Sequence, residues 1–263
     1  MCATSYRQWN LLRLIGPGWV VGFLSVSGSA LAESHAVSRL QLIPAGVTLP
    51  VQLGKTLSAG KTKPGTVFVV TTTQRIPLSE DWYLDRGAKL RGEVMISTAG
   101  DGTVDHPSVL TIRFTELSYR GQTVPVMTRA VAIANLMAVD DTFLPANGST
   151  DRGNSNQASW TTRQVGGDLV ARSGWVGPVV GTGLRTVGSA DFHGVYSLPV
   201  EIPNGTMVPL AMGVFSTTAE GLYSFDDGAQ LNSANGLITI TNGQRRAIIR
   251  NGDDLLLVVI PAR

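Results

Sequence analysis

Near its C-terminus the chain reads LITITNGQRRAIIRNGDDLLLVVI over residues 237–260. It divides into three runs that are expected to be strands, residues 237–241, 244–250 and 255–260. Two polar turns separate these runs, Asn242-Gly243 and the segment 251–254. Asn-Gly is the preferred pair for a type I′ turn, because both central residues of that turn need a positive φ. The stretch therefore predicts a three-stranded antiparallel meander, and its last strand, apolar at every position, is expected inside a sheet.

The rest of the chain continues this pattern of short apolar runs between turn residues. The whole chain contains 30 glycines and 13 prolines. Sustained apolar spacing at i, i+3 and i+4 is scarce, while short runs rich in Val and Thr are common. This profile predicts an all-β protein. We expect two β-barrel or sandwich-like modules, residues 40–137 and 166–261, joined by a flexible polar linker at 140–165.

Alternation is clearest in the first module. Residues 88–96 and 109–116 place apolar side chains on one face and polar side chains on the other, as a half-buried strand requires. Residues 130–138 fit either a short helix or a strand. The second module opens with a glycine-rich stretch, residues 166–189, which is expected to cross the fold irregularly.

The expected linker differs in composition from both modules. Residues 147–156 read NGSTDRGNSN, which is polar, small and without period. Such a segment cannot bury enough surface to offset the entropy lost on ordering.

The first 32 residues are typical of a cleavable signal peptide. Arg7 and Arg13 are their only charged residues, and an apolar run broken by Gly and Pro follows. The stretch ends with Ala30-Leu31-Ala32, and small residues at these positions are what signal peptidase accepts. We therefore expect cleavage after Ala32. The apolar run is shorter than the roughly 20 residues that a spanning helix needs, which disfavours an uncleaved anchor.

Charge and cysteine content limit the partners and the covalent cross-links that are expected of the exported chain. There are 21 Lys and Arg against 19 Asp and Glu, and removal of Arg7 and Arg13 balances the two. A balanced charge disfavours nucleic acid as a partner. The single cysteine, Cys2, leaves with the signal peptide. We expect no disulfide, no cofactor and no transmembrane segment in the mature chain.

The polar residues form no complete motif for a metal site or a nucleophile. The three histidines are His35, His106 and His193. A zinc site needs three or more converging ligands. Asp105, His106, Asp191 and His193 provide them only if the two modules pack in one particular way, so no metal site is predicted. The chain has no G-x-S-x-G elbow and no H-E-x-x-H, and no catalytic residue is predicted.

Three acidic pairs lie in expected turns. They are Asp140-Asp141, Asp226-Asp227 and Asp253-Asp254. Calcium needs six to eight oxygen ligands, roughly, and no loop here has acids at that density. We expect these pairs to be solvated turn residues.

Aromatic residues concentrate in the second half of the chain. They are Trp160, Trp175, Phe192, Tyr196, Phe215, Tyr223 and Phe225. Such residues either form a core or line a groove that binds carbohydrate or peptide, and both interpretations stay open.

A short phrase occurs once in each expected module. Residues 43–51 read IPAGVTLPV and residues 202–210 read IPNGTMVPL. In both, Pro fixes φ and Gly supplies the positive φ of a tight turn before an apolar strand. The phrase indicates either a duplicated strand-entry unit or two similar turns that arose by chance.

The first copy opens a longer series of turns and strands over residues 43–126. Its further members are Lys63-Pro64-Gly65, residues 84–94, residues 110–117 and residues 120–126. This order resembles the C-terminal β-barrel module of TrbI-like channel proteins of conjugative type IV secretion. It is more similar to uncharacterised secreted proteins of environmental bacteria that carry the same module, including a later V-F-S and G-L-Y at 214–216 and 221–223. The resemblance implies a β-barrel or sandwich that works in the cell envelope. A membrane-spanning role is not implied, because the channel's long helical hairpin has no counterpart here.

These observations favour an exported, non-catalytic protein of the bacterial envelope with a structural or protein-interaction role. Its place is the periplasm, the outer membrane surface or the medium. Its expected partners are other envelope proteins or a second copy, joined through a sheet edge. One alternative is an extracytoplasmic module that binds carbohydrate or peptide. A second is a hydrolase with an unrecognised carboxylate pair, since two carboxylates roughly 5 to 10 Å apart suffice for glycoside cleavage.

Overall fold

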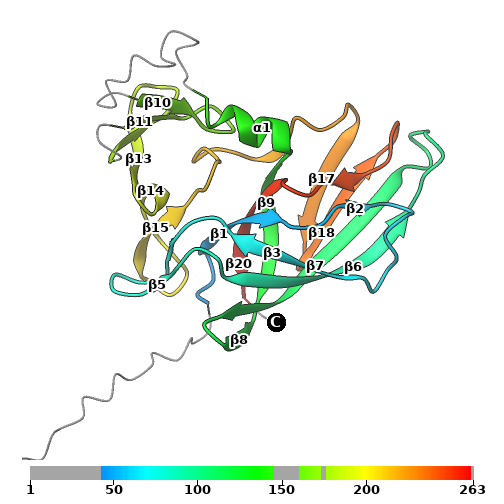
Figure 1. The fold of residues 1–263 in the computed structure, drawn as a ribbon, viewed down its shortest axis with the longest axis horizontal. Helices are drawn as coiled ribbons and strands as arrows, with labels where there is room; N and C mark the ends of the chain where they lie inside the picture. Colours follow the sequence, from blue (N-terminus) through cyan, green and yellow to red (C-terminus); the bar gives the residue numbers. More distant parts are fainter. Residues whose placement is uncertain (1–42, 145–159, 173–175, 262–263) are drawn as a thin grey trace, which may run out of the picture. The chain divides into compact units, whose positions relative to one another are not determined.

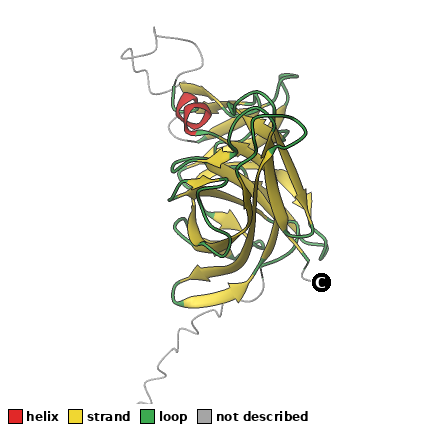
Figure 2. Ribbon diagram, turned by 90° about the vertical axis from the view of Figure 1, so that its right-hand side faces the viewer, coloured by secondary structure: helices red, strands yellow, loops and turns green. Residues whose placement is uncertain are grey.

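The computed structural model describes residues 43–144, 160–172 and 176–261 (Figure 1). They belong to one compact unit, residues 39–263. The fold is nearly all β, which confirms the predicted class, and α1 (Leu136–Asp141) is the one α-helix in the described ranges (Figure 2). Within those ranges no helix is long and apolar enough to cross a membrane.

A ten-stranded sheet forms a near-closed barrel. In spatial order its strands are β16 (Gly221–Tyr223), β9 (Met127–Ala134), β20 (Asp254–Ile260), β1 (Thr48–Leu53), β3 (Val67–Thr72), β6 (Lys89–Thr98), β7 (Ser108–Tyr119), β18 (Leu237–Asn242) and β17 (Ala229–Ala234), with β8 (Gln122–Pro125) beside β7. The pairing is antiparallel except between β16 and β9. The amide of Ala130 donates to Ser233 Oγ at 2.9 Å, which links β9 to β17 where the sheet closes.

A second sheet has six antiparallel strands in chain order. They are β10 (Trp160–Arg163), β11 (Leu169–Arg172), β12 (Gly177–Val180), β13 (Thr186–Asp191), β14 (Gly194–Glu201) and β15 (Met207–Ala211). Two short ladders complete the structure: β2 (Leu57–Ser58) with β19 (Ile248–Ile249), and β4 (Ile76–Pro77) with β5 (Tyr83–Leu84). The stretch 166–189, expected to cross irregularly, thus contains regular strands.

Strands β18 and β20 match their predicted ranges, but only Ile248–Ile249 of the expected strand 244–250 is a strand, and the predicted meander is wrong. β18 pairs with β7 and β17, β19 pairs with β2, and β20 pairs with β1 and β9. The turn after β18 is not type I′, because Asn242 and Gly243 are absent from the positive-φ residues. Instead, Asn242 Oδ1 accepts from the amides of Gln244 and Arg245, both at 2.8 Å. This Asx-type turn leads the chain away from β18 rather than back along it.

The large sheet also crosses the expected division between modules. β16, β17, β18 and β20, all from the second expected module, pair with one another or with strands of the first. Of the expected linker, residues 145–159 lie outside the described residues, as does the whole expected signal peptide, residues 1–32. The ambiguous segment 130–138 is a strand as far as Ala134 and a helix from Leu136.

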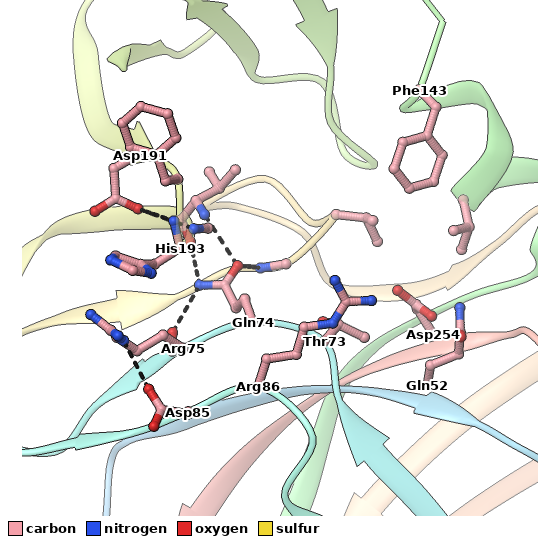
Figure 3. Close-up of a pocket in the computed structure, with 16 residues that line it drawn as sticks. Gln52, Thr73, Gln74, Arg75, Asp85, Arg86, Phe143, Asp191, His193 and Asp254 are labelled. Atoms are coloured by element: carbon pink, nitrogen blue, oxygen red, sulfur yellow. Dashed lines mark hydrogen bonds and ion pairs between the residues drawn. The ribbon is translucent and has the colours of Figure 1, made fainter. Parts of the chain in front are cut away.

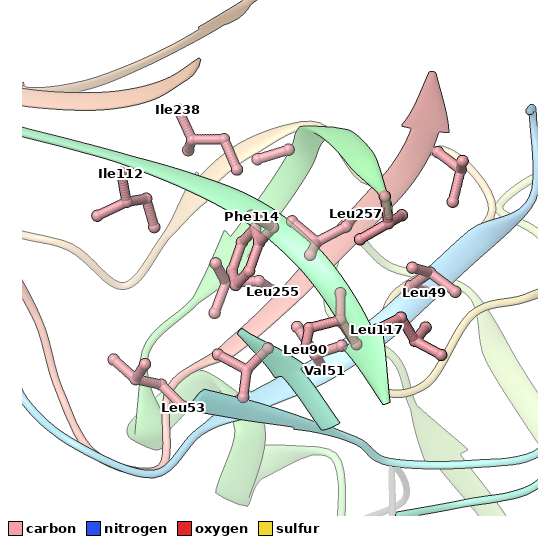
Figure 4. Close-up of a cluster of buried hydrophobic side chains, with 14 of the residues drawn as sticks. Leu49, Val51, Leu53, Leu90, Ile112, Phe114, Leu117, Ile238, Leu255 and Leu257 are labelled. Atoms are coloured by element: carbon pink, nitrogen blue, oxygen red, sulfur yellow. The ribbon is translucent and has the colours of Figure 1, made fainter. Parts of the chain in front are cut away.

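Strand β20 serves two cores, which explains why it is apolar at every position from Leu255 onward. Leu255 and Leu257 point into the barrel, where they meet Leu49 and Val51 of β1 (Figure 4). Leu256 leaves the opposite face and joins a second core around Phe215. Successive side chains of a strand leave opposite faces, so a strand between two packed layers must be apolar on both.

The two I-P-x-G turns lie against each other. Gly46 and Gly205 have φ of 90° and 82°, the positive values that the motif predicts. A Cβ on Gly46 would lie 2.7 Å from Pro203 Cδ. Ile43 and Ile202 are buried in the same core. The repeated phrase therefore brings the entries of β1 and β15 together.

Candidate functional site

A pocket of about 530 Å³, lined by both polar and apolar residues, lies between the barrel sheet and the second sheet. One end is formed by Asp254 of β20 and Phe143, which follows α1, and the other by Asp191 and His193 (Figure 3). The remaining lining residues are Gln52, Thr73, Gln74, Arg75, Asp85, Arg86, Val139, Phe192, Gly194, Val195, Gly213 and Val214.

Asp254 is the least satisfied polar group of the pocket. The side chains of Asp254 and Leu255 lie on opposite faces of β20. Leu255 points into the barrel, so Asp254 faces the pocket. The residue is 3% exposed, and Oδ1 has no hydrogen-bond partner among the described residues. Burial raises the pKa of this carboxyl to about 7, and the neighbouring charge of Asp253 adds to the effect. Gln52, paired with Asp254 across β1 and β20, partly offsets it.

Asp253 corrects the expectation that this acidic pair is solvated. It is fully buried, and its two carboxylate oxygens accept from the amides of Leu136 at 2.9 Å and Arg250 at 2.6 Å. It thus joins the start of α1 to the turn before β20. Burial still raises its pKa, although these two hydrogen bonds act in the opposite direction. The pairs Asp140-Asp141 and Asp226-Asp227 are exposed as predicted, but Asp140 and Asp141 end helix α1 rather than lie in a turn, and Asp226 pairs with Arg245.

Gln74 fixes the wall of the pocket. Its Nε2 donates to the carbonyl of Val195 at 2.9 Å, and its Oε1 accepts from the amides of Val195 and Gly213 at 3.1 and 2.8 Å. A Cβ on Gly194 would lie 2.5 Å from the Cδ of Gln74, so only glycine fits there. One buried amide therefore joins the β3–β4 connection to β14 and to the turn after β15 (Figure 3).

Two of the four residues weighed as zinc ligands line this pocket. Asp191 Oδ1 accepts from the amides of His193 and Gly194, at 2.7 and 3.1 Å, and so closes the β13–β14 turn. Asp105 and His106 lie instead in the exposed β6–β7 hairpin. Among the described residues, no group of three or more His, Cys, Asp or Glu is placed to hold a metal ion. His35 lies outside the described residues.

The basic residues of the pocket differ in how far they are engaged. Arg75 Nε pairs with Asp85 Oδ1 at 3.1 Å, and Asp85 also accepts from Tyr119 at 2.5 Å and Arg120 at 2.8 Å. The Tyr119 hydrogen bond and the two arginines keep the pKa of Asp85 below its usual value. Arg86 has no ion pair within the described part of the chain, and its guanidinium points toward the Asp254 end of the pocket in Figure 3. Its donors are therefore available to a ligand.

Exposed aromatic rings flank the polar lining. Phe143 is 66% exposed and Phe192 is 73% exposed, and both border the pocket. Of the aromatics singled out in the sequence, Tyr196 and Phe215 are core residues, and Tyr223 and Phe225 pack against the cores. Trp175 and the side chain of Trp160 lie outside the described residues. Tyr196 and Phe215 therefore bear out the core interpretation, while Phe192 borders the pocket.

A second cavity of about 560 Å³ is mainly apolar and lies between β7, the β8–β9 connection and the β17–β18 turn. Arg113, its charged lining residue, is paired with Glu93 at 2.8 Å. This cavity offers little for recognising a polar ligand.

Most of the pocket could not be read from the sequence. Gln52, Gln74 and Arg86 carry no local motif, and only the fold brings them together. Asp254 stands out in the sequence as half of an acidic pair, and the apolar run that follows it was the available signal that it begins a buried strand.

Comparison of the chain with family models, curated proteins and solved structures found no match. The class is thus defined by the fold and the site: a β-rich protein with a near-closed barrel sheet, a smaller antiparallel sheet and a pocket between them.

Proposed function

We propose that this chain is an exported, non-catalytic protein of the bacterial envelope that binds a saccharide in the pocket between its two sheets. The observation that carries the proposal is the composition of this pocket. Two exposed phenylalanines border a lining of carboxylate, amide and guanidinium groups. A cavity lined by apolar and aromatic side chains with a few polar groups among them is typical of a small-molecule site.

A saccharide uses both kinds of surface. Its C–H faces pack on aromatic rings, while its hydroxyl groups donate to carboxylates and accept from guanidinium groups. Here Phe143 and Phe192 offer the rings, Asp254 offers an acceptor and Arg86 offers donors. The cavity of about 530 Å³ falls in the range of roughly 300 to 1,000 Å³ that is usual for small-molecule sites.

A peptide added as an extra strand is less well supported. Such binding needs unpaired backbone groups along the groove. In the pocket wall, the amide of Arg75 donates to the carbonyl of His193 at 3.2 Å, and the amide of Thr73 donates to the carbonyl of Pro50 at 3.0 Å. Recognition in this pocket therefore relies on side chains.

A hydrolase is also less well supported. It needs a second carboxylate free to act with Asp254. The adjacent Asp253 is fully committed to two backbone amides, and Asp85 and Asp191 are each held by two or more hydrogen bonds. The role in assembly through a sheet edge stays a prediction.

The location rests on the sequence. The basic start, the short apolar run and the Ala-Leu-Ala motif ending at Ala32 support export. An extracytoplasmic location is consistent with a protein that binds saccharides of the envelope or the environment.

The test is a titration of ¹⁵N-labelled protein with a panel of neutral oligosaccharides and with a pool of short peptides. We expect at least one saccharide to shift the amide signals of Gly194 and Gly213, and the shift to weaken in Phe143→Ala and Phe192→Ala. An aromatic contact contributes about 0.5 to 1.5 kcal/mol, so each variant should lose about two- to tenfold in affinity.

The matched control is Val104→Ala, which removes a side chain that is 80% exposed in the β6–β7 hairpin, away from the pocket. Its affinity should equal that of the parent. Pocket shifts with the peptides alone, or no shifts with any probe, would overturn the proposal.

A further inference from the structure

The acidic end of the pocket contains a carboxyl whose charge, when it ionises, no described residue balances. Asp254 has no ion pair among these residues, and its Oδ1 has no hydrogen-bond donor. Asp253, its neighbour in the chain, is a buried carboxyl as well. A buried polar group without a partner is rare in native proteins, and its presence in a pocket indicates a missing partner.

The missing partner is a donor rather than an acceptor. An ionised carboxylate only accepts hydrogen bonds, and a cation within reach also offsets the cost of its burial. The pocket as a whole also favours a cationic ligand, because three carboxylates and only two guanidinium groups line it. The groups are Asp85, Asp191 and Asp254, and Arg75 and Arg86, with His193 as the further titratable side chain.

The described residues do not supply the donor. Arg75 is held by Asp85, and Gln52, the amide paired across the strands, leaves Oδ1 of Asp254 unsatisfied. Arg86 points toward this end of the pocket but forms no ion pair with the described acids. Phe143 stands at the same end and is 66% exposed. An aromatic face attracts a nearby cation, so this ring and the carboxylate favour the same kind of group.

We propose that the pocket binds an amine-bearing saccharide, whose protonated amine pairs with the carboxylate of Asp254. This inference rests on the proposed saccharide-binding function and names the class of sugar. Arg86 then serves the hydroxyl groups of the ligand.

The test compares three tetrasaccharides that differ in charge: the tetramers of glucosamine, N-acetylglucosamine and galacturonic acid. Affinities are measured by isothermal titration calorimetry at pH 6, where the free amine is largely protonated. The glucosamine tetramer should bind about tenfold more tightly than the acetylated one, the difference expected of a charge-assisted hydrogen bond. Asp254→Asn should abolish this preference, so that the variant binds the two tetramers with equal affinity.

The matched control is Asp227→Asn, which removes an exposed carboxylate from the β16–β17 connection. It should retain the preference for the amine. A second measurement uses the unaltered protein. Because Asp254 is partly protonated when free and ionised when paired, binding of the amine should release protons, and titrations in two buffers of different ionisation enthalpy detect them.

The outcomes separate the two proposals. If no tetrasaccharide binds, the saccharide function itself is overturned. If the acetylated or the acidic tetramer binds as well as the amine, saccharide binding stands and the role of Asp254 is overturned. That role is also overturned if the preference survives in Asp254→Asn, or if binding of the amine releases no protons.

Discussion

Replacing Asp254 by Asn should change how the stability of this protein depends on pH. Asp254 is 3% exposed, and its pKa rises from 3.8 to about 7 in the folded chain. The folded state therefore holds this proton more tightly than the unfolded state does. Stability is greatest below the unfolded pKa and falls as the pH rises toward the folded pKa. Asn keeps the shape and cannot ionise, so this contribution disappears.

The magnitude follows from the difference between the two pKa values. At about 1.4 kcal/mol for each pH unit, ionising Asp254 costs about 4 kcal/mol of unfolding free energy once the pH is well above 7. Roughly 2.5 kcal/mol of this cost falls between pH 5 and pH 8. The parent protein should lose that amount over this interval relative to Asp254→Asn. At pH 8 the variant should be the more stable protein.

Urea unfolding at pH 5 and pH 8 measures the effect, with the free energy taken from the midpoint and slope. Asp253 also has a raised pKa, and its charge adds to that of Asp254, so the comparison measures Asp254 together with its interaction with this neighbour. Asp227→Asn, an exposed substitution, should follow the parent at both pH values. Equal pH dependence in the parent and in Asp254→Asn would refute the reasoning and show that the carboxyl is solvated or paired.

Three further predictions concern the fold and its export. Leu257→Ala should lower the unfolding free energy by about 2 to 5 kcal/mol and the melting temperature by about 5 to 15 °C, because Leu257 is fully buried between β1 and β9. Leu184→Ala, the same deletion at a residue that is 85% exposed, should melt like the parent; equal melting of the two variants would show that β20 is not a core strand. Asn242→Ala should cost about 1 to 2 kcal/mol in a urea melt, because two turn amides lose their acceptor, and an unchanged midpoint would mean that water replaces it. Mass spectrometry of the protein exported from a bacterial host should find Glu33 as the first residue, and an intact N-terminus would contradict the cleavage site.

Much of the secondary structure follows from local pattern. The alternation of residues 88–96 predicts β6 because successive side chains of a strand leave opposite faces. The unbroken apolar run at 255–260 predicts a strand covered on both faces, and β20 does contact two cores. The glycines of the I-P-x-G turns have the positive φ that their sequence predicts.

Pairing between strands did not follow from local pattern. Asn242-Gly243 permits a hairpin, but the Asn side chain has a competing use as acceptor for two amides, and the choice depends on what each strand can bury. β20 buries both faces only between β1 and β9, which lie far from it in the chain. Long-range burial therefore overrides the tendency of neighbouring strands to pair.

The site shows the same division between sequence and tertiary structure. Sequence alone predicted the β class and an export signal, and it determined the residue types available. Whether Asp254 is solvated or buried depends on which strands cover β20, and neither its neighbours nor its spacing contains that information. Phe143, Asp254, Gln74 and His193 come from segments far apart in the chain, and they meet only because the second sheet packs against the barrel sheet. A carboxylate acquires its partners and its pKa from such packing, since both depend on distance and on exclusion of water rather than on sequence order.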